Sequence, residues 1–182
     1  MPVITALNPQ TTTGKSKTLF DAVQTKLGMV PNMMRTMGHA PAVLEGYLSF
    51  SGALAGGTLS AKLREQIALT VAGKNECDYC ASAHTVLGKK AGLDEKEIPL
   101  NLDGKATDAK SQAVLDFTLK VVEKRGQVSD ADVKAIKEAG FSETEVVEMV
   151  AVIALNIFTN YFNHVADTEI DFPVVKTKKA LV

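Results

Sequence analysis

The sequence predicts an all-α fold, and two observations support this prediction. Apolar residues recur with helical spacing along nearly the whole chain, whereas the alternation of Val, Ile and Thr that is typical of strands is almost absent. Glycine and proline, with Ser at several helix-starting positions, divide this pattern into segments of helical length. The chain has 182 residues, so we expect a single all-helical domain over residues 1–182.

The first half of the chain predicts a series of short helices. Pro41 suits the first turn of a helix that ends at Gly56, and Ser60 is a good N-cap for the helix after it. We expect Asn75 to cap a further helix that ends near Gly92. These helices are expected over residues 15–27, 33–37, 41–54, 61–72 and 76–92.

A turn-rich connection over residues 93–107 leads to the second half of the chain. It contains Pro99 and Gly104, which favour turns. Beyond it, Ser129 and Ser142 are expected N-caps of amphipathic or apolar segments. This half, about residues 107–170, predicts helices over residues 109–124, 130–139 and 143–166.

The last of these helices is apolar nearly all round. We therefore expect it to be buried in the core or at a subunit interface. Its most apolar stretch, residues 146–158, is shorter than the ~20 residues of a membrane span, so no membrane segment is expected. We expect the tail to be extended over residues 171–175 and mobile over residues 176–182.

Composition excludes several classes of function. The 20 basic and 21 acidic residues give a net charge of −1, which excludes the basic surface that nucleic acids or anionic membranes require. The N-terminus has no signal-peptide pattern, so the expected compartment is the cytoplasm. No glycine-rich phosphate loop is present, and we expect no nucleotide, flavin, haem or other cofactor.

The two cysteines are the most informative residues. Cys77, Cys80 and His84 follow one another at i, i+3 and i+7, so on a helix all three can share one face. A position near a helix start favours the thiolate, which is the reactive form of cysteine, and His84 can take or return a proton. A Cys-x-x-Cys pair can also close into a disulfide after one sulfur is oxidised. The pattern therefore favours redox chemistry.

Glu65 completes this set of candidate catalytic residues. It lies on the preceding helix and shares a face with apolar residues, so its carboxylate needs a partner. We expect that partner to be His84, with Glu65 orienting the imidazole and relaying protons. The alternative is an exposed Glu65 that pairs with Lys62.

The spacing E-x11-C-x2-C-x3-H, from Glu65 through Cys77 and Cys80 to His84, resembles the AhpD-like alkyl hydroperoxidase branch of the carboxymuconolactone decarboxylase family. The Leu-Ser-x-x-x-Arg-Glu segment that ends at Glu65 and the Ala-Gly-Leu after His84 are similar to the same family core, about residues 43–97. The flanking residues 27–32 and 160–164 resemble the longer peroxidase-related subgroup.

This resemblance implies an AhpD-like helical fold, trimers or hexamers, and reduction of a hydroperoxide. It assigns the attacking sulfur to Cys80, the resolving sulfur to Cys77 and a proton relay to Glu65 and His84. It also implies a dithiol reductant, which in the best-known branch of the family is a lipoylated protein. The well-studied hydroperoxidases have a histidine directly before the second cysteine, where this chain has Tyr79.

Several alternatives stay open at the level of sequence. The cysteines could bind zinc, although structural zinc usually needs four ligands, or they could simply be buried. The Glu65 and His84 pair could serve a lactone decarboxylase as acid and base, or the chain could be a non-catalytic redox-sensing or scaffolding subunit. A group of polar residues on the last helix could line a pocket or form a polar seam that fixes helix or subunit packing: Asn156, Asn160, Asn163 and His164. Tyr79 is a further candidate for lining the pocket.

Overall fold

The computed structural model describes residues 1–177, and the regular structure within this range is helical, without strands. The all-α prediction is therefore confirmed for the described part of the chain. Residues 178–182, which belong to the segment expected to be mobile, lie outside it. The helices are α1 (Gly14–Leu27), α2 (Asn32–Met37), α3 (Pro41–Ala55), α4 (Ala61–Lys74), α5 (Asp78–Lys90), α6 (Glu97–Leu102), α7 (Ala109–Glu123), α8 (Asp130–Glu138) and α9 (Glu143–Ala166).

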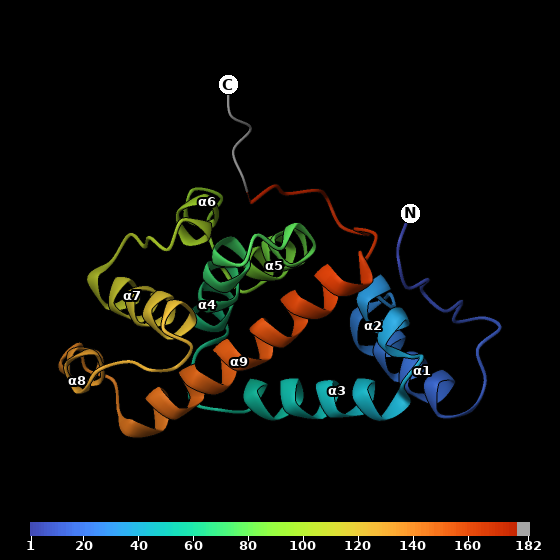
Figure 1. Ribbon diagram of the computed structural model, residues 1–182, viewed down its shortest axis with the longest axis horizontal. Coiled ribbons are helices and arrows are strands. Elements are labelled where there is room, and N and C mark those ends of the chain that lie inside the picture. Colours follow the sequence, from blue (N-terminus) through green and yellow to red (C-terminus); the bar gives the residue numbers. More distant parts are fainter. Residues whose placement is uncertain (178–182) are drawn as a thin grey trace.

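Helices α4 and α9 organise the molecule. Helix α9 runs diagonally across it, with α4 and α5 on one side and α3 on the other, while α1 and α2 lie beyond one end of α3 (Figure 1). Helix α4 packs against α5, α6, α7 and α9, and every side chain from Gln66 to Ala72 is buried. Helix α4 is thus central to the core, and the Glu65 side chain comes from its first half.

The chain turns sharply between α4 and α5, which corrects one expected boundary. Asn75 follows the end of α4 rather than starting α5, and Cys77 is itself the N-cap of α5. Glu76 has a positive φ of 57°, a left-handed conformation that a continuing right-handed helix cannot contain. The start of α5 is therefore set by the cysteine itself.

The remaining boundaries agree closely with expectation, apart from one added helix. The connection over residues 93–107 contains the short helix α6, in which Pro99 occupies the first turn, where a missing backbone N–H is tolerated. Ser60 caps α4, and Ser129 and Ser142 form capping boxes with Asp132 and Glu145.

Helix α9 is buried on one side only, which argues against full burial in the core and leaves the subunit-interface alternative as a prediction. Met149, Val152 and Ile153 are buried, whereas Val147 and Val165 are 68% and 71% exposed. By length and composition α9 could cross a membrane, and 33% of its most apolar window is buried. Core helices of soluble proteins meet the same criterion, and α9 packs against α3, α4, α5, α7 and α8.

Candidate active site

The two cysteines form a disulfide at the N-terminus of α5. Their Cα atoms lie 5.3 Å apart, within the range that a disulfide spans. The backbone N–H of Cys80 donates to the Cys77 sulfur at 3.2 Å, because Cys77 occupies the N-cap position. Both residues are only 2% exposed. The local geometry thus holds the pair within one helical turn, beneath the protein surface.

Glu65 and His84 are hydrogen-bonded to each other. The Nδ1 atom of His84 lies 2.8 Å from Oε2 of Glu65, so the contact expected from the sequence is present. Lys62, the alternative partner of Glu65, instead pairs with Glu97 at 3.0 Å. Because α4 and α5 pack side by side, residues that are nineteen apart in sequence come together as an oriented acid–base pair.

A cavity of about 520 Å³ connects these groups. Cys80, Glu65 and His84 all line it, and most of its remaining wall is apolar, including Met33 and Phe172. The disulfide, the acid–base pair and an apolar binding space therefore open onto the same volume. Such a cavity is large enough for a small organic molecule.

Tyr79 holds the C-terminal segment of the chain at this cavity through a hydrogen bond. We call residues 167–177, which follow α9, the C-terminal strap; it passes above α5 (Figure 1). The Tyr79 hydroxyl donates to Oδ1 of Asp171 at 2.9 Å and accepts the Met33 backbone N–H at 3.1 Å. Burial raises the pKa of Tyr79, and the nearby carboxylate of Asp171 raises it further. Tyr79 is therefore a neutral phenol that lines the cavity and anchors the strap.

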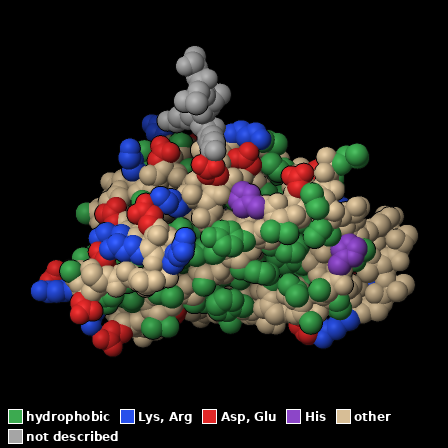
Figure 2. Space-filling model, viewed as in Figure 1, with side chains coloured by type: hydrophobic (Ala, Val, Ile, Leu, Met, Phe, Trp, Pro, Cys, Tyr) green, Lys and Arg blue, Asp and Glu red, His purple; other side chains and the backbone are tan. Residues whose placement is uncertain are grey.

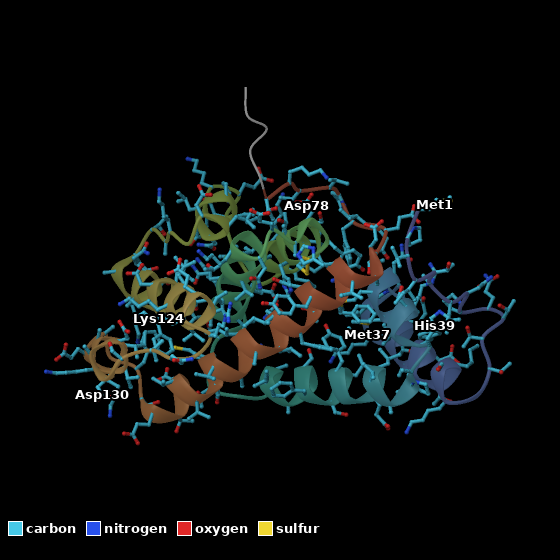
Figure 3. The ribbon with its side chains drawn as sticks, viewed as in Figure 1. Met1, Met37, His39, Asp78, Lys124 and Asp130 are labelled. Carbon is cyan, nitrogen blue, oxygen red and sulfur yellow. A yellow bond between two sulfur atoms is a disulfide. The ribbon has the colours of Figure 1, made fainter. Side chains whose placement is uncertain are left out.

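Asp78 provides a second anchor for the strap. Its carboxylate accepts hydrogen bonds from the backbone N–H and hydroxyl of Thr177, both at 2.9 Å, and pairs with Lys176 at 2.9 Å. Figure 3 places Asp78 at the upper edge of the molecule, beneath the strap. Lys176 and Thr177 were expected to belong to a mobile tail, and this expectation is wrong because Asp78 holds both.

Asn160 and His164 hold the turn before Cys77. The Asn75 side-chain amide donates to Oδ1 of Asn160 at 3.1 Å, and Nε2 of His164 lies 2.9 Å from the Asn75 carbonyl oxygen. Asn160 does not line the cavity that Cys80 and His84 share. For Asn160 these contacts agree with the polar-seam alternative, in which α9 fixes the chain that leads into α5. His164 makes such a contact and also lines a second cavity, so both alternatives stay open for it.

The sequence named Asn163 only as part of the polar face of the last helix, without its contact to Cys80, and did not single out Tyr47; both residues line the cavity. The side-chain amide of Asn163 donates to the Cys80 sulfur at 3.3 Å and to the Met33 sulfur at 3.4 Å. Burial, followed by the charge of Glu65, raises the pKa of Tyr47 to about 12. The available signal for Asn163 was its spacing from Asn156 and Asn160 on an apolar helix.

Among residues 1–177, no three or more His, Cys, Asp and Glu side chains come together as a possible metal site. The two cysteines bond to each other, and His84 bonds to Glu65. The described residues around the disulfide are those of an acid–base and thiol site.

Comparisons with known proteins give the class of the fold first. The structure is similar to that of a peroxidase-related protein of Ralstonia eutropha JMP134 described as an alkylhydroperoxidase AhpD core (TM-score 0.85, 24% identity, 93% of this chain and 92% of that one). A peroxidase-related protein of Silicibacter sp. TM1040 is also similar (TM-score 0.79, 23% identity, 91% of each chain). The chain therefore has an AhpD-like helical fold.

The debrominase Bmp8 shares this fold. It has been solved as a cysteine-to-alanine variant in complex with 2,3,4-tribromopyrrole (TM-score 0.78, 18% identity, 93% of this chain and 91% of that one). The fold thus supports more than one chemistry. A search of curated proteins by sequence finds no match.

A family model matches the sequence of the core helices. Residues 41–124 match the model of the carboxymuconolactone decarboxylase family. This segment contains α3 to α7, and with them the disulfide, Glu65 and His84. Together with the structural similarity, this match supports an AhpD-like member of the carboxymuconolactone decarboxylase family.

Proposed function

We propose that this protein is a thiol-dependent peroxidase that reduces an organic hydroperoxide at Cys80. The observation that carries the proposal is the common cavity: the disulfide's Cys80 and the hydrogen-bonded Glu65 and His84 open onto the same apolar space. Peroxidases of this kind need a reactive sulfur, a proton donor for the leaving alkoxide and a second sulfur to close the cycle. The site contains all three.

The oxidative half of the cycle begins with the reduced pair. The Cys80 thiolate attacks the terminal oxygen of the hydroperoxide, the O–O bond breaks, and the alkoxide takes a proton from His84 to leave as an alcohol. Cys80 is then a sulfenic acid. The Cys77 thiol attacks its sulfur, water leaves with the former peroxide oxygen, and the Cys77–Cys80 disulfide forms. Glu65 orients His84 and stabilises the imidazolium between these steps.

Asn163 supports the attacking sulfur. Its amide N–H lies 3.3 Å from the Cys80 sulfur and, in the reduced protein, would donate to the thiolate. Hydrogen bonds to charged groups are stronger than those to neutral ones, so this contact lowers the free energy of the thiolate more than that of the thiol. Asn163 can stabilise the thiolate without a histidine between the two cysteines. Tyr79 occupies that position and anchors the strap.

The reductive half requires an external dithiol, which we propose to be a small dithiol or a lipoylated protein in the cytoplasm. Two thiols are oxidised to a disulfide while Cys77 and Cys80 return to thiols, so the electrons balance those given to the peroxide. The reducing conditions of the cytoplasm supply such thiols.

Peroxide consumption tests this proposal directly. Wild type and Cys80→Ser are compared with cumene hydroperoxide as substrate and dihydrolipoamide or dithiothreitol as reductant. We expect wild type to consume peroxide over many turnovers and Cys80→Ser to fall to the rate without protein. Equal rates for the two proteins would contradict the mechanism. A disulfide that forms in air without turnover, with a change in molecular size, would instead indicate a redox-sensing subunit.

A second candidate function rests on the 2.8 Å contact between Glu65 and His84. This pair could act as acid and base on a lactone, as the family's name suggests, without either sulfur. The double variant Cys77→Ser/Cys80→Ser separates the two functions. Decarboxylation of a muconolactone by this variant would favour the second candidate, and its absence in wild type would exclude it.

We further propose that the exposed face of α9 binds a second copy of the chain in a trimer or hexamer. Figure 2 shows apolar side chains gathered over the middle of the viewed face, where α9 crosses the molecule. The exposed apolar residues of α9 are three, four or eight positions apart and so share one face of the helix: Val147, Val150, Phe158, Tyr161 and Val165. Apolar surfaces of this extent are typical of interfaces.

A further inference from the structure

A second cavity lies against the disulfide. It measures about 610 Å³ and is lined by residues of the α4–α5 turn, the end of α9 and the C-terminal strap. Cys77 lines this second cavity and Cys80 does not, whereas Cys80 lines the first cavity and Cys77 does not. The disulfide therefore joins two residues that line different cavities.

The two cavities differ in chemical character. Apart from the neutral phenol of Tyr79, the ionisable groups of the described residues that line the second cavity are four carboxylates, from Glu76, Asp78, Asp167 and Glu169, together with Lys176, the N-terminal amino group of Met1 and the imidazole of His164. Lys176 is paired with Asp78, and the four carboxylates outnumber the two ammonium groups, so the lining carries an excess of negative charge. The first cavity is mostly apolar, as its methionines indicate. A ligand suited to one cavity is therefore poorly suited to the other.

Two unpartnered polar side chains line the second cavity. Thr168 is 9% exposed and Asn163 is 5% exposed, and both contribute to its wall. Neither Oγ1 of Thr168 nor Oδ1 of Asn163 has a hydrogen-bond partner among the described residues. Buried polar atoms usually have a hydrogen-bond partner. These two atoms therefore indicate that the cavity can bind a small polar ligand.

We infer that the second cavity binds the reducing thiol, in uncharged or cationic form, and directs it to the sulfur of Cys77. A thiolate attacks a disulfide along the line of the S–S bond, from the side away from the leaving sulfur. Attack on Cys77 must therefore come from the side opposite Cys80, and we assign this approach to the cavity that Cys77 lines and Cys80 does not. Peroxide and reductant thus reach the pair from separate sides.

The exchange step balances. The reductant thiolate forms a bond to the Cys77 sulfur, the Cys77–Cys80 bond breaks, and its electron pair goes to Cys80. The released Cys80 thiolate faces the first cavity and accepts the Asn163 N–H. A second thiol then attacks the reductant sulfur of the mixed disulfide, and Cys77 leaves as a thiolate and takes a proton.

The excess of carboxylates selects among reductants. Charges on the cavity wall raise the local concentration of a cationic ligand and lower that of an anionic one. Thiols with no negative charge therefore react faster than anionic thiols of similar intrinsic reactivity. The inference rests on the proposed function only in that a disulfide must be reduced during turnover.

A matched series of thiols tests the inference without peroxide. The disulfide is formed with diamide, and its reduction is followed with cysteamine, 2-mercaptoethanol and 3-mercaptopropionate, each rate being corrected for the fraction of thiolate. At low ionic strength we expect cysteamine to react about tenfold faster than 3-mercaptopropionate, with the ratio falling as salt screens the cavity. A ratio near one would overturn the inference.

Charge variants show whether the second cavity causes this preference. Asp167→Asn/Glu169→Gln removes two of its carboxylates, and Asn tolerates the left-handed backbone at position 167, where φ is 47°. Glu95→Gln/Glu138→Gln removes the same charge elsewhere. We expect the preference to fall to about threefold or less in the cavity variant and to persist in the control. Equal ratios in the two variants would overturn the inference.

The position of the mixed disulfide tests the direction of attack. The reaction is quenched with N-ethylmaleimide, and mass spectrometry of the peptide that contains both cysteines locates the adducts. We expect the reductant on Cys77 and the maleimide on Cys80, and the opposite distribution would overturn the inference. Reduction through Cys77 with no oxidation by peroxide would instead refute the proposed function while leaving this inference intact.

Discussion

Replacing Asn163 should raise the pKa of the Cys80 thiol. Its side-chain N–H lies 3.3 Å from the Cys80 sulfur, at the wall of the substrate cavity. The informative variant is Asn163→Leu in a Cys77→Ser background. In that background Cys80 cannot form a disulfide, and a Ser at position 77 can still cap α5. The leucine keeps a similar volume and removes the donor.

The size of the shift follows from the strength of the lost hydrogen bond. A hydrogen bond to a charged group contributes about 1.5–3 kcal/mol, and one pKa unit corresponds to about 1.4 kcal/mol. We therefore expect the pKa of Cys80 to rise by about one to two units. The fold should tolerate the change, because Oδ1 of Asn163 has no partner that the substitution would strand.

The assay is the pH dependence of thiolate absorbance at 240 nm, repeated as the rate of alkylation by iodoacetamide. Asn156→Leu in the same background is the matched control, because Asn156 is on the same helix, lines the same cavity and donates only to the Val152 carbonyl oxygen. The control should leave the pKa unchanged. The same pKa for Cys80 in the Asn163 and Asn156 variants would refute the reasoning.

The other predictions concern the acid–base pair, the C-terminal strap and the interface. Glu65→Gln should lower kcat/KM for hydroperoxide by about 100-fold or more while the disulfide still forms with diamide; unchanged kcat/KM would exclude a proton relay. Tyr79→Phe should lower the free energy of unfolding by about 1–2 kcal/mol in urea titrations, because Asp171 loses a buried donor. Burial raises the pKa of Asp78, but hydrogen bonds from the strap outweigh this and hold the pKa below its ordinary value. The contact therefore stabilises the strap at neutral pH and is lost as the pH falls through the lowered pKa. The backbone amides of the strap should then exchange hydrogen faster in acid. Asp78→Asn should remove this pH dependence. Phe158→Glu should reduce the mass in light scattering to that of a monomer; an unchanged mass would place the interface elsewhere.

Local signals in the sequence were sufficient for most of the helices. Ser129 and Ser142, each with an acidic residue three positions on, predicted helix starts that the structure confirms. The start of α5 was not predictable in this way, because Asn75 is a preferred N-cap residue and cysteine is not, yet Cys77 is the N-cap of α5. The choice depends on the left-handed turn at Glu76, which the contacts of Asn75 with α9 help to hold.

The candidate site likewise has one part that the local sequence pattern predicted and one part that it did not. The helical spacing of Cys77, Cys80 and His84 brought them together because they lie on one short helix, and Glu65 lies on the adjacent one. Asn163 is more than eighty positions away from Cys80. No periodicity relates two residues at that distance, so its contact with the sulfur could not be anticipated.

The sequence by itself determined the helices, the redox pair and its partner carboxylate, because all three depend on interactions within a few turns of the chain. Only the tertiary structure decided which space each sulfur faces. The packing of α9 against α5 brings Asn163 to Cys80, and the C-terminal strap adds walls to both cavities. These features arise from contacts between distant segments, whose geometry is set by the packing of the whole fold rather than by local residue pattern.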